Sequence, residues 1–289
     1  MRDGSAQQKT FMIELFNRSA LECSKLITER YSTSFTLGIK TLNRKFHFPI
    51  YAVYGFVRYA DEIVDTFYDH DQKYLLDKFK KDTYEAIETG ISLNPILHSF
   101  QSVVRTYSID RKLIDAFLKS MEMDLYCNEY TDNSYQEYIY GSAEVVGLMC
   151  LRVFCEGNLA MFDRLKEPAR KLGAAFQKVN FLRDLKSDYV DRGRIYFPGV
   201  DFNDFTKDTK QLIEEDIQRD FDEAYIGILN LPRGARMGVY LAYTYYQTLF
   251  NKIKQVPASR IQEERVRVPD LKKIALLAQT YMRFRWSGM

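Results

Sequence analysis

Apolar residues recur at helical spacing along almost the whole chain, and strand-like alternation is almost absent. Asn94 and Pro95 have the chemistry of an N-cap and a first helical position, and a second helix is expected to start at Asp110. Arg265–Val268 is the best strand candidate, and a weak one. Further helices are expected over residues 10–31, 49–67, 73–88, 135–156, 164–189, 209–229, 235–255 and 271–284. This periodicity predicts an all-α fold.

The composition favours one helical domain over residues 1–289. Hydrophobic residues make up 46% of the chain and charged residues 28%, which are ordinary values for a globular protein with a sizeable core. With only 14 Gly and 7 Pro, tight turns are scarce, and this disfavours a many-stranded sandwich or barrel. The clearest breaks are residues 193–199 and 231–234, and no linker-like tract or internal repeat divides the chain.

Several classes of protein are excluded by charge and by cysteine and histidine content. The 41 basic and 39 acidic residues leave no global field that would recruit nucleic acid. Four cysteines without a CxxC pair and three histidines do not make a zinc site of the usual spacing, and Cys150 and Cys155 are expected to be core thiols. The N-terminal residues have no apolar signal core, and the apolar stretch Met237–Phe250 is shorter than the about 20 residues of a membrane span. A cytoplasmic protein is therefore expected.

A first stripe of polar residues lies on the otherwise apolar helix expected over residues 49–67. Its members follow one another at steps of four, three and four, which places them on one helix face: Tyr54, Arg58, Asp61 and Asp65. Taken alone, Asp61 and Asp65 fit a surface ion-pair pattern with Arg58 as well as they fit a ligand site.

The helix expected over residues 164–189 has a second stripe of this kind. Its members are spaced three, four and four apart: Gln177, Asn180, Asp184 and Asp188. Amide side chains within an apolar helix indicate that this polar face is buried inside the protein. By contrast, Asp216 and Asp220 stand among many other charges, so we expect them to form a solvated face.

Paired carboxylates of this kind suit a hard cation. Mg²⁺ takes one or two carboxylates and completes its coordination shell with water and phosphate oxygens, so two Asp pairs on facing helices would hold Mg²⁺ ions bridged by a diphosphate. Arg58, Arg183 and Arg194 would add forked donors for phosphate. Loss of diphosphate from an allylic carbon leaves a carbocation, which aromatic faces in a dry cavity stabilise. The 20 Phe and 21 Tyr fit this requirement, although most of them must belong to the core.

In four separated segments the chain resembles the squalene/phytoene synthase family. These are YSTSF at Tyr31–Phe35, the first aspartate-rich signature at Tyr51–Asp65, the segment Tyr138–Gly147, and the second signature at Ala175–Pro198. Glu62 also matches the first signature, whereas Ser187 stands where the second usually has Glu. The resemblance implies an isoprenoid-synthase-type helical bundle around a central hydrophobic cavity.

The resemblance also assigns roles to individual residues. It implies metal binding by Asp61, Asp65, Asn180, Asp184 and Asp188. The final base is expected to be the released diphosphate or a tyrosine hydroxyl such as that of Tyr54 or Tyr246. The residues implied in binding substrate are Ser32, Ser34, Phe35, Arg58, Tyr138, Ser142, Val146, Gln177, Asn180, Arg183, Arg194, Tyr196 and Arg265.

The implied reaction is the Mg²⁺-dependent (or Mn²⁺-dependent) joining of two prenyl diphosphates through a cyclopropylcarbinyl diphosphate. Phytoene formation from two geranylgeranyl diphosphates is the favoured interpretation. Squalene or dehydrosqualene formation from farnesyl diphosphate is the alternative, and only the squalene reaction would need NADPH. A non-catalytic helical assembly factor of the same fold is disfavoured because all four aspartates are present, and a chain-elongating enzyme because DDxxD is missing. No protein partner is indicated, and the basic C-terminal stretch is an alternative site for peripheral contact with anionic lipid.

Overall fold

The structure, a computed structural model, describes residues 2–263, 265–267, 280 and 282. Contacts between residues divide the chain into two compact units, residues 1–110 and 111–289. Every regular element in the described ranges is a helix, and the one strand-like feature there is an isolated bridge between Glu129 and Ile195. The all-α prediction is confirmed. The helix expected over residues 271–284 and the end of the strand candidate at Val268 lie outside the described residues, apart from positions 280 and 282.

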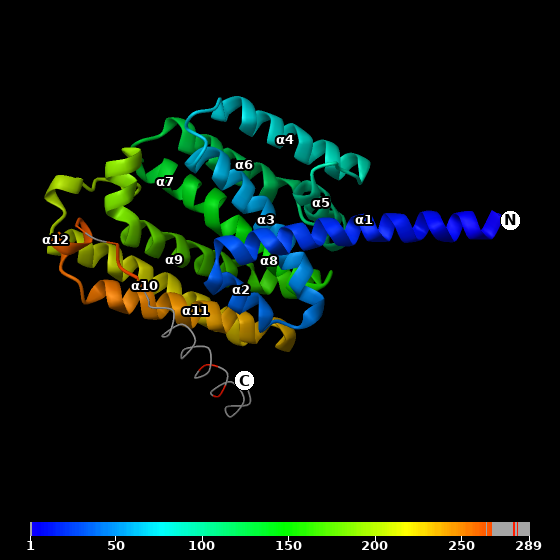
Figure 1. Cartoon of the computed structure of the whole chain (residues 1–289). Coiled ribbons are helices and arrows are strands. Elements are labelled where there is room, and N and C mark those ends of the chain that lie inside the picture. The colour runs from blue at the N-terminus through cyan, green and yellow to red at the C-terminus, as the bar shows by residue number, and fades with distance from the viewer. Residues whose placement is uncertain (1, 264, 268–279, 281, 283–289) are drawn as a thin grey trace. The chain divides into compact units, whose positions relative to one another are not determined.

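The first unit contains five helices packed around a core of stacked aromatic rings. Helix α1 packs against α3 and α5, and α5 also packs against α4, while the N-terminal turns of α1 extend past these partners (Figure 1). Phe56 lies between Phe79 and Phe100, with ring centroids 5.5 and 3.8 Å away. The helices are α1 (Arg2–Tyr31), α2 (Thr33–Lys40), α3 (Arg44–Asp65), α4 (Gln72–Thr89) and α5 (Pro95–Tyr107).

Helix caps explain where the helices of the first unit begin. The Asn94 side chain accepts hydrogen bonds from the amides of Ile96 and Leu97, and Pro95 is the first helical residue, as predicted. The predicted start of α3 at Pro49 is wrong, because this helix begins at Arg44 behind an Asn43 cap. Pro49 lies in the second turn, where its missing N–H costs a single backbone hydrogen bond.

The second unit is built around α9, a helix of 34 residues. Helix α9 packs against α8, α10, α11, α12 and the π-helix η1. The elements of this unit are α6 (Arg111–Tyr126), α7 (Asp132–Ile139), η1 (Tyr140–Glu144), α8 (Val145–Cys155), α9 (Leu159–Arg192), the 3₁₀ turn η2 (Phe202–Asp204), α10 (Lys207–Leu229), α11 (Arg233–Lys254) and α12 (Ala258–Ile261).

A π-helix interrupts the segment that the sequence predicted as one helix over residues 135–156. Glycines allow this π-helix to pack closely against both α6 and α9. A Cβ on Gly141 would lie 2.5 Å from the Ala116 carbonyl oxygen of α6, and one on Gly173 of α9 would lie 2.6 Å from the Ala143 carbonyl oxygen. Only glycine permits such close backbone approach, so these two positions fix η1 between α6 and α9.

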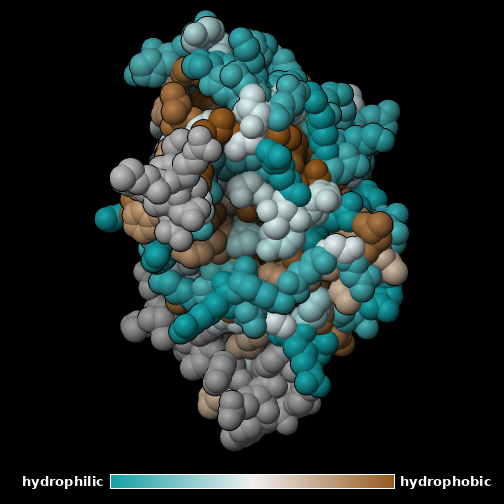
Figure 2. Space-filling view, turned by 90° about the vertical axis from the view of Figure 1, so that its right-hand side faces the viewer, coloured by the Kyte–Doolittle hydropathy of each residue, from teal (hydrophilic) through white to brown (hydrophobic). Residues whose placement is uncertain are grey.

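The continuous helical segment Asp132–Cys155 is long and apolar enough to cross a membrane, and it is the one such segment among the described residues. However, 61% of its most apolar stretch is buried inside the structure, as also occurs in the core helix of a soluble protein. Among the residues coloured in Figure 2, hydrophilic ones predominate on this face, and hydrophobic ones form separate groups.

The prediction that Asp216 and Asp220 form a solvated face is wrong. Asp220 is buried with a side chain 3% exposed, and it accepts hydrogen bonds from Lys171 (3.0 Å) and from the buried Lys178 (2.6 Å). Asp216 is partly exposed and pairs with Lys178 and Arg219. The two lysines reach from α9 to α10, so charges that look like a surface stripe in the sequence form an ion-pair network between two helices.

Candidate functional site

In the first unit the predicted polar stripe lies on α3 and is partly buried. The Arg58 guanidinium donates to Glu62 Oε2 through Nε (3.0 Å) and Nη2 (2.6 Å), and it stacks 4.4 Å over the Tyr31 ring. Burial acts to lower the pKa of Arg58, but the bonds to Glu62 and the nearby Asp61 outweigh it, so the pKa lies above its ordinary value. Arg58 therefore carries a fixed positive charge next to Asp61, while Asp65 lies one turn further on the same face.

Glu62 holds this guanidinium in place. Thr66 donates to Glu62 Oε1 over 2.7 Å, and the same carboxylate accepts the paired donors of Arg58. Burial would raise the pKa of Glu62, but the bonds from Thr66 and Arg58 lower it below the ordinary value. Glu62 is thus ionised at neutral pH and orients Arg58.

The YSTSF segment forms the start of α2, a helix that the sequence analysis did not predict. Ser32 is its N-cap, and its hydroxyl accepts a hydrogen bond from the amide of Phe35 over 3.2 Å. The rings of Phe35 and Tyr54 are 5.3 Å apart, so α2 and the polar stripe of α3 meet at these two side chains. Ser34 is partly buried in the first turn of α2.

In the second unit, Asp184 of α9 lies between two arginines. Arg183 donates to it through Nε (2.9 Å) and Nη2, and Arg265 lies with Nε 2.7 Å from Oδ1 and with Nη2 3.2 Å from Oδ2. The Asp184 side chain is 17% exposed. Burial lowers the pKa of Arg183, but the bond to Asp184 more than compensates, so its pKa is raised. Three residues of the predicted site, Arg183, Asp184 and Arg265, are therefore in contact.

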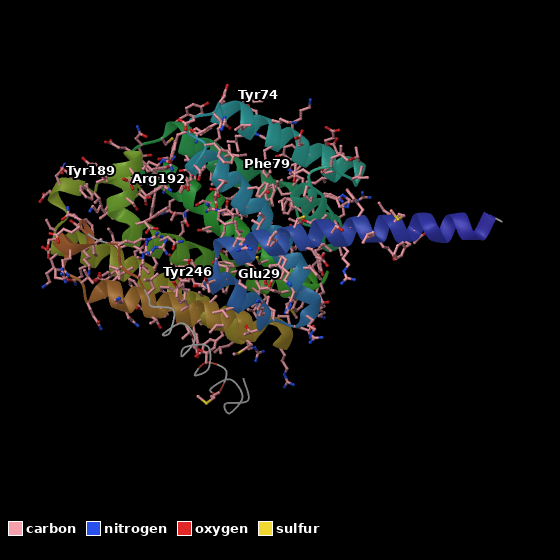
Figure 3. The ribbon with its side chains drawn as sticks, in the orientation of Figure 1. Glu29, Tyr74, Phe79, Tyr189, Arg192 and Tyr246 are labelled. Carbon is pink, nitrogen blue, oxygen red and sulfur yellow. The ribbon has the colours of Figure 1, made fainter. Side chains whose placement is uncertain are left out.

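Asp188 lies one turn further along α9 and is more deeply buried. Its side chain is 7% exposed and accepts a hydrogen bond of 2.9 Å from Arg192 Nη1. Arg192 and Tyr189 are labelled near the C-terminal end of α9 in Figure 3. Arg192 was not among the predicted site residues, although its spacing of four residues from Asp188 was a usable signal.

Tyr246 of α11 joins the same face of α9. Its hydroxyl donates to Asn180 Oδ1 over 3.3 Å, and its ring stacks on Phe176 with centroids 3.9 Å apart. Figure 3 labels Tyr246. Burial raises the pKa of Tyr246, and the nearby Arg183 only partly opposes this. The phenol is therefore protonated at neutral pH and acts as a hydrogen-bond donor. Gln177 is partly buried one turn before Asn180.

Arg194, Tyr196 and Tyr138 form a separate buried cluster around Asp124, a residue that the sequence analysis missed. Arg194 Nη2 donates to the Asp124 carbonyl oxygen over 2.5 Å. The Tyr138 hydroxyl donates to Asp124 Oδ2 over 2.8 Å, and the Tyr196 hydroxyl donates to Oδ1 over 3.3 Å. The substrate roles implied for these three residues stay predictions. Their polar side-chain atoms form hydrogen bonds with the carboxylate and the backbone carbonyl group of Asp124.

The pocket segment predicted from the resemblance lies on η1 and α8. Ser142 is on the π-helix, and its hydroxyl is buried without a hydrogen-bond partner. Val146 is partly buried in the first turn of α8. Nearby, burial raises the pKa of the Cys150 thiol to about 12 and that of Cys155 to about 11, which agrees with core thiols.

The oxygen donors on α9 are of the kind that Mg²⁺ prefers. Within the described part of the chain, no group of three His, Cys, Asp or Glu side chains could hold a metal ion by itself. However, one or two carboxylates suffice for Mg²⁺ when water and phosphate oxygens complete its shell. Asp184 and Asp188, with arginines beside both, therefore fit a Mg²⁺–diphosphate complex in their chemistry.

The described residues define an all-α protein with paired aspartates next to arginines on α9. The chain belongs to the squalene/phytoene synthase family: the family's sequence model matches residues 28–272, which extend across both units. Members of this family are prenyltransferases of the squalene and phytoene synthase type.

Two curated relatives are similar to the chain over most or much of its length. Phytoene synthase of Arthrospira platensis is 29% identical over 292 residues, covering 91% of this chain and 93% of the relative. The 4,4'-diapophytoene synthase of Staphylococcus haemolyticus is 27% identical over 195 residues, covering 66% of each chain. Against the two maize chloroplastic phytoene synthases, the chain spans 69% and 60% of the relatives' length.

A solved structure has the same fold. A dehydrosqualene synthase crystallised with a ligand superposes with a TM-score of 0.79 at 21% identity, covering 93% of this chain and 98% of the other. This similarity confirms the predicted isoprenoid-synthase-type helical fold.

Proposed function

We propose that this protein joins two prenyl diphosphates head to head and releases diphosphate, and that its substrate is geranylgeranyl diphosphate, giving phytoene. The observation that carries the proposal is the arrangement on α9, where Asp184 and Asp188 share one face with Asn180 and are accompanied by Arg183, Arg192 and Arg265. The similarity to phytoene synthases over about nine tenths of the chain supports the choice of product.

The proposal assigns Mg²⁺ binding to both aspartate-rich segments, Asp61 with Asp65 and Asp184 with Asp188. When bound, the ion neutralises the charge of the departing diphosphate. The arginines would contribute forked hydrogen bonds to phosphate oxygens. Tyr246, protonated and bonded to Asn180, would present a hydroxyl and an aromatic face to the cationic part of the substrate. We also propose that the protein is cytoplasmic and can contact the membrane surface, because its prenyl substrates are lipids.

A second candidate is condensation of two farnesyl diphosphates to dehydrosqualene or squalene. It is favoured by the similarity to the Staphylococcus 4,4'-diapophytoene synthase and to the dehydrosqualene synthase structure. The two candidates share the diphosphate chemistry and differ in the length of the prenyl chains.

Product identification tests both candidates. The purified protein is incubated with Mg²⁺ and either geranylgeranyl or farnesyl diphosphate, with and without NADPH, and the hydrocarbon is identified by mass spectrometry. A C40 product formed without reductant supports the phytoene proposal. A C30 product supports the second candidate, with NADPH dependence separating squalene from dehydrosqualene. Absence of any condensation product overturns both.

A further inference from the structure

The C-terminal end of α9 is closed by a turn that brings the next residue back to Asp188. Gly193 has a left-handed φ of +65°, and its amide donates to the Tyr189 carbonyl over 3.0 Å. The amide of Arg194 donates to the Asp188 carbonyl over 2.8 Å. The backbone of Arg194 is therefore hydrogen-bonded to the backbone of Asp188, whose side chain is the last carboxylate of the second signature.

The side chain of Arg194 points into the protein and ends at Asp124, near the C-terminal end of α6. Arg194 Nη2 donates to the Asp124 carbonyl oxygen over 2.5 Å, and Nη1 lies 3.4 Å from Asp124 Oδ1. The two side chains are 7% and 4% exposed. A buried guanidinium needs a counter-charge, and Asp124 provides one within this contact.

Two further parts of the unit converge on Asp124. Tyr138 of α7 donates to Oδ2 over 2.8 Å, and Tyr196 donates to Oδ1 over 3.3 Å, so both carboxylate oxygens are engaged. The Tyr196 ring stacks on Phe181 of α9, with centroids 3.9 Å apart and planes within 7°. Asp124 therefore connects α6, α7 and the segment after α9, and through Tyr196 it also supports α9 itself.

We propose that Asp124 is a positioning residue that fixes the C-terminal turn of α9, and with it the Asp188 carboxylate, through the buried side chain of Arg194. This inference rests on the proposed function, because it takes Asp188 to be part of the Mg²⁺–diphosphate site. It assigns Arg194 to the support of that site, in place of the direct phosphate contact that the resemblance implies.

The protonation states agree with this arrangement. Burial, followed by the negative charge of Asp124, raises the pKa of both Tyr138 and Tyr196. Both phenols are therefore protonated at neutral pH, and both can donate to the carboxylate.

Asp124→Asn tests the inference because it keeps the shape of the side chain and removes the charge opposite Arg194. We expect the amides of Arg194 and Ile195 to exchange hydrogen about tenfold faster, because the Arg194 amide donates to the Asp188 carbonyl within the turn and the Ile195 amide donates to the Asn128 carbonyl directly after it. We also expect the Kd for inorganic diphosphate, measured by calorimetry with Mg²⁺ present, to rise roughly tenfold or more, as is typical for residues that orient metal ligands.

A matched control comes from a second buried ion pair, between Lys178 of α9 and Asp220 of α10. Asp220→Asn breaks the contact of Asp220 with Lys178, again in an aspartate paired with a buried base. It should lower the thermal midpoint while leaving the Kd for Mg²⁺–diphosphate and the exchange at Arg194 unchanged. A milder variant, Tyr138→Phe, removes one hydroxyl from Asp124 and keeps the ring, so it should shift exchange and Kd in the same direction by a smaller factor.

The outcomes separate this inference from the proposed function. If the wild-type protein does not bind diphosphate with Mg²⁺, the proposed function fails, and with it the role of Asp124 in ligand binding. If the wild type binds but folded Asp124→Asn and Tyr138→Phe keep its Kd and its exchange rates, the positioning role is overturned. Equal weakening of binding by Asp220→Asn would also overturn it, because any loss of stability would then have the same effect.

Discussion

Arg265 contacts Asp184 from 81 positions further along the chain, with Nε 2.7 Å from Oδ1. Arg183, the neighbour of Asp184 on α9, also binds this carboxylate, with its Nε 2.9 Å from Oδ1. Before any ligand is present, the carboxylate proposed to hold Mg²⁺ is thus paired with the cations proposed to hold phosphate. Binding of Mg²⁺ alone must displace arginines, whereas Mg²⁺ and diphosphate together can exchange partners with both.

We therefore expect Mg²⁺ and inorganic diphosphate to bind synergistically. Each ligand should raise the affinity for the other by about tenfold or more, and the two factors must be equal because coupling is reciprocal. Arg265→Gln should reduce this factor, since it removes one of the competing cations. Calorimetric titration of each ligand, with and without the other, measures the coupling, and additive binding in the wild-type protein would contradict the prediction.

Asp61→Asn and Asp184→Asn should each lower turnover by at least about 100-fold, because a neutral amide is a weaker ligand for a divalent cation. The helical content should not change, since neither residue belongs to the hydrophobic core. Circular dichroism and a product assay check both points. Asp82→Asn is the control: Asp82 pairs with Lys78 on the exposed surface of α4, so activity should stay within a factor of two. Near wild-type turnover in either signature variant would rule out the metal assignment.

Asp220→Asn should lower the free energy of unfolding by about 3 kcal/mol, because it removes the buried partner of Lys178. Asp216→Asn should cost only about 1 kcal/mol, since Asp216 is more exposed and Lys178 keeps Asp220. Urea denaturation of the two variants measures the difference. Equal effects would show that the network does not distinguish the buried carboxylate from the exposed one.

Asp216 should also contribute to acid unfolding. Burial acts to raise its pKa, but the bonded Lys178 and Arg219 lower it below the ordinary value of 3.8. A lowered folded-state pKa stabilises the protein above the unfolded-state pKa, and the contribution is lost as the pH falls below 3.8 through the folded-state value. Stability measured between pH 5 and 2 should therefore fall less steeply in Asp216→Asn than in the wild type, and parallel curves would contradict this role.

Gly141→Ala should destabilise the second unit by about 1–3 kcal/mol through overpacking, because the new methyl group would lie 2.5 Å from the Ala116 carbonyl oxygen. Gly157→Ala is a useful comparison. There a Cβ meets nothing within 4 Å, and the cost would come from its φ of +85° alone. Thermal unfolding, measured together with the Kd for diphosphate, would show whether displacing η1 also weakens the proposed Mg²⁺–diphosphate site. An unchanged midpoint for Gly141→Ala would mean that α6 and η1 are free to separate.

Local signals predicted most of the helices and both polar stripes. Asn94 and Pro95 mark a helix start through contacts within three residues, so the sequence suffices there. The eight residues of α2 were missed because so short a helix has little periodicity, and its Ser32 cap is a weak signal alone.

The contacts of Asp124 and Asp220 with residues distant in the chain could not be predicted. Asp124 has partners 14 and 70 positions away, and no spacing rule connects them. Asp220 looked like part of a solvated stripe because its own helix is rich in charge, whereas its environment is set by Lys178, 42 positions away. The sequence identified the aspartates whose chemistry suits a metal ion. Of the arginines paired with them, Arg183 and Arg265 were predicted and Arg192 was not.

Because α9 is one continuous helix, the direction in which each side chain leaves the helix axis is fixed relative to all the others. Lys171 and Lys178 attach the helix to α10, and the signature residues from Asn180 onward face another direction on the same continuous rod. Inserting one residue between these two groups would rotate them by about 100° relative to each other. Asp184 and Asp188 would keep Arg183 and Arg192, which lie on the same stretch of α9, but Asp184 would turn away from Arg265. Evolution can thus exchange side chains along this helix far more readily than it can add or delete a position within it.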